Sequence, residues 1–142
     1  MNTSVRKRLT KFRVGGVVVA ATAMIGLAGS PAFAQTNATV YGESARSNCA
    51  HSSKGVFTAE GEAFHLTDTC ADGWDAVMKV DVAPYRSGGG YDFTIWNTGG
   101  NGSTKNVDKS YAEGTGVCIW AGYGEASSGE WTGFGPGSCG VA

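Results

Sequence analysis

The sequence contains only two histidines, His51 and His65, so a Ser-His-Asp hydrolase would have to use one of them. No G-x-S-x-G segment is present, the turn that exposes the nucleophilic serine in many hydrolases. His65 falls on the polar side of an alternating segment and His51 lies in a polar stretch beside Cys49, so we expect both to be solvated. The histidines therefore favour no nucleophilic site.

Carboxylates gather in two places, at Glu60 and Glu62 and at Asp68, Asp72 and Asp75. Glycoside hydrolysis needs two carboxyl groups about 5 to 9.5 Å apart across a cleft, one of them with a raised pKa. A small domain rich in loops offers little cleft, so we interpret these groups as solvated turn residues. Because no nucleophile, base and oxyanion donor can be combined, the sequence predicts a protein that is not an enzyme.

The segment from Asp68 onward partly resembles a calcium-binding loop. Loop positions one, five and six match, but position three is Cys70 and position twelve is Lys79. We interpret Asp72-Gly73 as a hairpin turn and expect no metal and no cofactor, with an irregular calcium site as the alternative.

All four cysteines, Cys49, Cys70, Cys118 and Cys139, follow residue 34, and their even number predicts two disulfides in an exported chain. Three pairings are possible. The equal spacing within Cys49/Cys70 and Cys118/Cys139 favours these two pairs. A four-thiolate metal site is disfavoured because no C-x-x-C pair occurs.

Residues 1–34 read as an export signal. A basic start through Arg13 precedes an apolar stretch of about 14 residues, and Ala32-Phe33-Ala34 fits the small-residue cleavage rule. The apolar stretch is shorter than the about 20 residues that span a bilayer. We expect cleavage after Ala34, which leaves residues 35–142 as a secreted extracellular domain without a stable membrane anchor.

Charge excludes two classes of partner. Five of the eleven basic residues and none of the twelve acidic ones lie in the signal, so its removal changes the net charge from −1 to −6. Binding to nucleic acid needs a basic face that neutralises phosphates, and docking on anionic lipid needs a basic segment. We therefore expect no nucleic acid and no membrane partner.

After residue 34, apolar residues recur with the two-residue period of a strand. This part of the chain also holds 19 of the 23 glycines. The clearest segment, 74–82, predicts Trp74, Ala76, Met78, Val80 and Val82 inward and Asp75, Lys79 and Asp81 in water. It forms a predicted hairpin with 91–97, in which Tyr91, Phe93 and Ile95 face inward. Further strands are predicted at 38–41, around 56–58, and at 63–67, 104–110, 116–121 and 130–134. These seven or eight strands predict an all-β fold, a small antiparallel β-sandwich, with a closed barrel as the alternative.

Five short motifs between residues 61 and 140 resemble those of a group of small exported β-proteins of actinobacteria. They are Gly61-Glu62-Ala63-Phe64-His65-Leu66, Ala71-Asp72-Gly73, Asn97-Thr98-Gly99, Ala112-Glu113-Gly114-Thr115 and Gly137-Ser138-Cys139-Gly140. The similarity spans about residues 56–142. It implies a β-fold and export, and it implies no activity.

Aromatic residues provide the binding hypothesis. Trp74, Phe93, Ile95 and Val117 suffice as core anchors, and Trp96 and Trp120 point opposite to Ile95 and Ile119. A shift of register by one residue is the alternative, since it would bury both indoles. Without that shift, some of the four residues Trp96, Trp120, Tyr123 and Trp131 are exposed. We expect these to bind an extracellular polysaccharide or a secreted protein. The second hypothesis is a secreted inhibitor of an extracellular hydrolase, inserting the loop 48–54 or 124–131.

Overall fold

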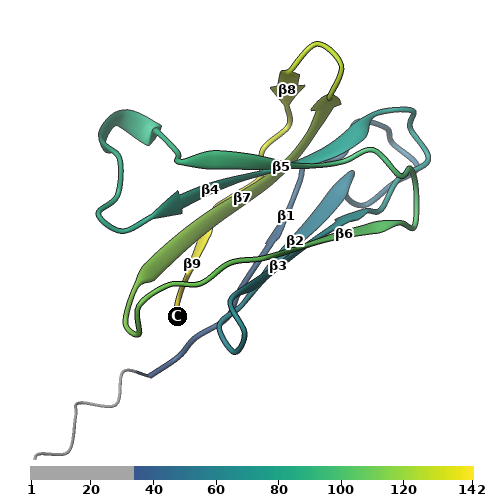
Figure 1. Cartoon of the computed structure of the whole chain (residues 1–142). Helices are drawn as coiled ribbons and strands as arrows, with labels where there is room; N and C mark the ends of the chain where they lie inside the picture. The colour runs from purple at the N-terminus through teal and green to yellow at the C-terminus, as the bar shows by residue number, and fades with distance from the viewer. Residues whose placement is uncertain (1–33) are drawn as a thin grey trace, which may run out of the picture. The chain divides into compact units, whose positions relative to one another are not determined.

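A computed structural model describes residues 34–142. The predicted export signal, apart from Ala34, lies outside the described residues. The described chain forms two antiparallel sheets that face each other (Figure 1). The four-stranded sheet has the order β1 (Ala38–Tyr41), β2 (Ser53–Thr58), β3 (Ala63–Asp68) and β6 (Thr104–Asp108). The five-stranded sheet has the order β5 (Phe93–Asn97), β4 (Asp75–Val82), β7 (Gly116–Glu125) and β8 (Glu130–Thr132), and β9 (Ser138–Val141) also pairs with β7.

The predicted all-β sandwich with two disulfides is confirmed. Cys49 is bonded to Cys70, and Cys118 is bonded to Cys139. The first disulfide ties the loop before β2 to the loop after β3, and the second joins directly opposed residues of β7 and β9. Between residues 34 and 142, no helix is long and apolar enough to cross a membrane.

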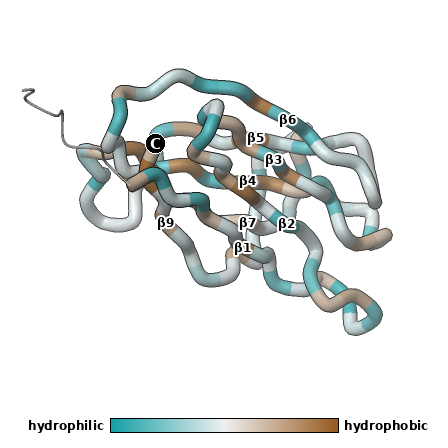
Figure 2. The backbone as a smooth tube through the Cα atoms, turned by 90° about the horizontal axis from the view of Figure 1, so that it is seen from below, coloured by the Kyte–Doolittle hydropathy of each residue, from teal (hydrophilic) through white to brown (hydrophobic). Residues whose placement is uncertain are grey.

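The core lies between the sheets and follows the alternation of the strands. Phe64 and Leu66 of β3 and Met78 and Val80 of β4 are completely buried in it, as is Ile119 of β7. In Figure 2 the backbone of β4 carries apolar positions in brown, whereas the edge strand β6 is mostly polar. The alternation thus identifies the inner face of the central strands correctly.

Two features of the sheets were not predicted. The chain has nine strands, because the short segment Ser138–Val141 pairs with β7 as β9. The turn at Asp72-Gly73 does not close a hairpin, since β3 and β4 belong to different sheets. Gly73 has a φ of 84°, so this turn still needs glycine, but it serves to carry the chain from one sheet to the other.

The outer face of the five-stranded sheet is less polar and less exposed than the sequence predicts. Val77 is completely buried there, and Asp81, predicted to face water, is 4% exposed and accepts hydrogen bonds from the Arg86 backbone N–H. The end of β8 and the residues after it lie against this face. A Cβ at Gly122 would contact the carbonyl of Thr132 and the ring of Phe134. Glycine therefore makes room for the returning chain.

Candidate functional site

The predicted orientation of two indoles agrees with the structure. Ile95 and Ile119 are buried in the core, and the residues that follow them, Trp96 and Trp120, lie on the outer face of the sheet and are half-buried. The alternative register, which would bury both indoles, is wrong. Alternation along β5 and β7 is sufficient to place these side chains.

Four rings form an aromatic cluster on this outer face, which we call the outer cluster: Tyr91, Trp96, Trp131 and Phe134. The ring of Trp131 lies 6.3 Å from that of Trp96, 5.7 Å from that of Tyr91 and 6.4 Å from that of Phe134, between centroids. The prediction that Tyr91 faces inward is therefore wrong. Tyr91 precedes the first residue of β5, so the strand alternation does not govern it.

The ammonium of Lys79 is held by the rings of the outer cluster. Its Nζ lies 3.8 Å from the centroid of Phe134 and 5.7 Å from those of Tyr91 and Trp131. The faces of aromatic rings attract a cation, which keeps this lysine on the cluster. Burial lowers the pKa of Lys79 from its ordinary value. The outer cluster is thus already occupied by a side chain of the protein.

The four residues predicted to bind, Trp96, Trp120, Tyr123 and Trp131, do not form one site. Trp96 and Trp131 meet in the outer cluster, but Trp120 lies against Gly137. Tyr123 lies beside Gly133 and packs on Trp74, with 6.2 Å between ring centroids. All four are half-buried.

Trp74 is the exposed indole, which corrects its predicted role as a core anchor. It is 46% exposed, the highest value among the four tryptophans. β4 begins only at Asp75, so Trp74 belongs to the preceding turn and does not follow the alternation. An indole that the core does not use is available to a ligand.

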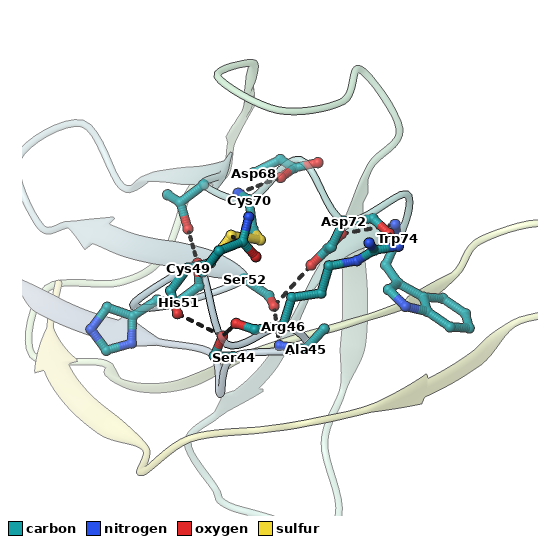
Figure 3. The surroundings of a disulfide bond; sticks show 12 residues. Ser44, Ala45, Arg46, Cys49, His51, Ser52, Asp68, Cys70, Asp72 and Trp74 are labelled. Carbon is teal, nitrogen blue, oxygen red and sulfur yellow. Dashed lines mark hydrogen bonds between the residues drawn. A yellow bond between two sulfur atoms is a disulfide. The ribbon is translucent and has the colours of Figure 1, made fainter.

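The turn before Trp74 is fixed by hydrogen bonds. Asp72 accepts a bond from the Trp74 backbone N–H through Oδ1 (2.9 Å) and one from the Ser52 hydroxyl through Oδ2 (3.0 Å). The Arg46 guanidinium donates to the Asp72 carbonyl at 2.9 Å. In Figure 3 the indole of Trp74 points away from the Cys49–Cys70 disulfide, while Asp72 points toward Ser52. The disulfide-braced loops therefore hold the backbone from which Trp74 projects.

Three large aromatic side chains in residues 34–142 are exposed, and each lines a different hollow. Tyr85 lines a hollow of about 740 Å³, Tyr41 one of about 560 Å³, and Trp74 one of about 500 Å³. The Tyr41 hollow contains His51, whose ring stacks on Tyr41 with 4.7 Å between centroids.

The Trp74 hollow lies between the turn before β4 and the β7–β8 hairpin. It is lined by Trp74, Gly124, Gly129, Glu130, Trp131 and Thr132. Gly124 lies opposite Trp131 in the β7–β8 ladder, and its lack of a side chain leaves the hollow open beside Trp74. Glu130 and Thr132, which alternate with Trp131 along β8, add two polar residues to its lining. Of the four predicted residues only Trp131 lines this hollow. Strand alternation does not identify Trp74 as exposed, although the preceding Asp72-Gly73 turn indicates that the strand begins after it.

No protein-family model, curated protein or solved structure matches this chain. Its similarity to small exported actinobacterial proteins remains a prediction from short motifs.

The carboxylates predicted to be solvated turn residues include two that are buried. Asp68 and Asp72 are 2% and 5% exposed. Burial raises the pKa of Asp68, with Asp72 and Asp75 adding to the effect, while the hydrogen bond from the Cys70 backbone N–H opposes it. Both side chains accept hydrogen bonds from loop groups, so they are part of the loop structure and are not solvated. Within the described part of the chain, no group of three or more potential metal ligands is present.

The hydrogen bonds of the two histidines do not involve a serine hydroxyl. His65 Nδ1 bonds to Asn106 Oδ1 at 2.7 Å across the β3–β6 pair, and His51 Nδ1 lies 3.3 Å from the Gly42 carbonyl. Each ring is therefore engaged in a structural contact. These contacts position loops and strands, and they supply no activated serine.

Proposed function

We propose that the protein is a secreted, non-enzymatic binding module that holds a neutral carbohydrate against Trp74. The observation that carries the proposal is the exposed indole of Trp74 in a hollow that Trp131 also lines. The C–H face of a sugar ring packs on an indole, which supplies a large rigid apolar area. Trp74 projects from a fixed turn, so little conformational freedom is lost on binding.

The polar wall of the hollow supports a carbohydrate over a purely apolar ligand. Glu130 accepts and Thr132 both donates and accepts hydrogen bonds, as sugar hydroxyls require. Small-ligand sites typically combine an aromatic surface with a few such polar groups. Gly124 allows the ring to approach the sheet backbone.

The proposed location outside the cell is supported by the two disulfides, which persist in oxidising compartments. It agrees with the predicted signal and with the resemblance to exported proteins that the short motifs predict. We further propose that a polysaccharide of the surroundings is the natural source of the bound sugar.

Affinity electrophoresis tests this function. The purified protein is run through gels that contain one of three neutral polymers: hydroxyethyl cellulose, arabinoxylan free of uronic acid, or glycol chitin. We expect one polymer to retard the protein, and we expect Trp74→Ala to lose that retardation. Trp120→Phe is the matched control, because Trp120 does not line the hollow. Equal migration of the wild type and Trp74→Ala in every gel would contradict the proposal.

A hydrolase inhibitor is the second candidate, and one observation favours it. The β7–β8 hairpin extends beyond the neighbouring strands (Figure 1), and Asp75 Oδ2 braces it by accepting a bond from the Ala126 backbone N–H at 3.0 Å. A projecting, braced loop is the geometry of a pre-organised inhibitor. Inhibition of a secreted hydrolase that Ser127→Trp abolishes and Trp74→Ala leaves intact would favour this candidate.

A further inference from the structure

The hollow beside Tyr85 is separate from the Trp74 hollow, since the two share no lining residue. It has a volume of about 740 Å³ and is built from the end of β4, the start of β5 and the segment after β6. Small-ligand sites commonly have volumes of about 300 to 1,000 Å³, so its size suits a small molecule or a chain end.

One wall of this hollow is apolar. Val82 and Phe93 pack against the core from β4 and β5, and Pro84 and the half-exposed ring of Tyr85 extend the apolar surface outward. A hydrocarbon group placed on this wall would leave water, which is favourable in proportion to the apolar area covered.

A cation without an acidic partner lies at this wall. Lys109 Nζ is 4.7 Å from the centroid of the Phe93 ring, and no carboxylate in residues 34–142 lies within 4.0 Å of it. The other cation, Arg86, is neutralised by Asp92, with 2.7 Å between NH2 and Oδ1. The lining therefore carries one net positive charge on a domain whose predicted net charge is negative.

A partly buried tyrosine that packs against the core lines the same hollow. Tyr111 lines it, and its hydroxyl is buried without a hydrogen-bond partner in the described chain. An unsatisfied buried polar group is rare and costs free energy. Burial, with the Asp92 and Glu62 carboxylates, raises the pKa of Tyr111, so the phenol keeps its proton and is a donor at neutral pH.

We propose that this hollow is a second binding site, which takes a carboxylate attached to an apolar group. The carboxylate would pair with Lys109, and the apolar group would cover Phe93, Val82 and Tyr85. The net positive charge of the lining favours an anion over a cation, and the apolar wall disfavours an inorganic anion. A free aromatic acid and the C-terminal end of a peptide carry the same chemistry.

The test is an NMR titration of the purified protein, with backbone amide shifts as the readout. The probes are phenylacetate and its neutral amide, phenylacetamide, and N-acetyl-Gly-Phe with a free or an amidated C-terminus. We expect the acids to bind with a dissociation constant on the order of 1 mM and to shift the Phe93, Lys109 and Tyr111 amides. Binding of phenylacetate points to a free acid, and binding of the peptide alone points to a chain end.

Variants identify the charge that matters. Lys109→Met keeps the aliphatic stem and should weaken acid binding about tenfold, whereas Lys109→Arg should retain it. Lys105→Met is the control, since Lys105 is exposed on β6 and does not line the hollow. Equal binding of an acid and its amide, or equal loss in Lys105→Met, would overturn the proposal. Trp74→Ala should leave acid binding unchanged, so this site and the proposed carbohydrate site fail independently.

Discussion

Trp131 of β8 lies directly opposite Gly124 of β7 in the antiparallel ladder. A Cβ at Gly124 would contact the Glu130 carbonyl and the Trp131 Cα, so the glycine lets β8 approach β7 closely. This pair lies between the outer cluster and the Trp74 hollow. It places Trp131 in the outer cluster, and it leaves the hollow beside Trp74 without a side chain at its base.

Replacing Gly124 with alanine should destabilise the fold at β8. Because the added methyl overlaps backbone atoms that cannot rotate away, we expect the free energy of unfolding to fall by about 1 to 3 kcal/mol. Urea denaturation measures the change. Gly100→Ala is the control, since a Cβ there meets no atom within 4 Å and only its positive φ of 77° opposes substitution. A Gly124→Ala protein as stable as the wild type would contradict this account of the ladder.

The disulfide between β7 and β9 should contribute measurably to stability. Cys118 and Cys139 are 21 residues apart, and in the chain-entropy model a loop of this size corresponds to about 3 kcal/mol. The double variant Cys118→Ala/Cys139→Ala should therefore unfold at lower urea concentration, with Cys49–Cys70 still intact by mass spectrometry of a non-reduced digest. An unchanged midpoint would show that the ladder alone holds β9.

Asp68 should give the protein an unusual response to pH. Its folded pKa lies above the ordinary 3.8, so the folded state keeps a proton that the unfolded state has released. The Asp68 contribution is therefore fully present below 3.8 and is lost as pH rises through the raised folded pKa. Asp68→Asn cannot ionise and keeps an oxygen for the Cys70 backbone N–H. Its stability relative to the wild type should increase with pH over this window.

Urea denaturation of both proteins over a pH series checks this prediction. The opposite effect of Asp92, whose pKa is lowered by the Val82 backbone N–H and by Arg86, is common to both proteins and cancels in the difference. A difference that is constant with pH, or that decreases as pH rises, would contradict the burial of an ionisable Asp68.

Trp74 should dominate the quenching of tryptophan fluorescence by acrylamide. The other three indoles are half-buried in packed surroundings, so collisional quenching should fall most in Trp74→Phe and less in Trp96→Phe, Trp120→Phe or Trp131→Phe. Stern–Volmer plots of the four single variants give the comparison. A largest decrease in Trp96→Phe would contradict the prediction, since the outer cluster would then be more accessible to acrylamide than Trp74.

Strand alternation predicts the inner face of the central strands because a core position leaves little choice of residue type. Phe64, Leu66, Met78 and Val80 all follow it. It fails at Trp74 and Tyr91, which stand just outside β4 and β5, where turns rather than pleats set the direction of the side chain. It also fails at Asp81, because the burial of an outer face depends on which distant segment crosses it.

The candidate site was predicted only in part for the same reason. Trp131 could be chosen as a surplus aromatic, but its neighbours in the hollow come from a turn before β4 and from the β7–β8 pairing. Contacts between distant segments are not visible in local periodicity. The disulfide pairing agrees with the one that equal spacing favours, although four cysteines allow three pairings and the opposition of Cys118 and Cys139 across β7 and β9 is not visible in the sequence.

Carbohydrate binding at Trp74 is tested by following the four indole N–H signals of the ¹⁵N-labelled protein during titration with cellohexaose, xylohexaose and chitohexaose. If a sugar binds in the hollow, the Trp74 and Trp131 signals should shift together and saturably, while the Trp120 signal stays in place. Saturable shifts confined to Trp120, or no shift of any indole with all three sugars, would contradict carbohydrate binding at Trp74.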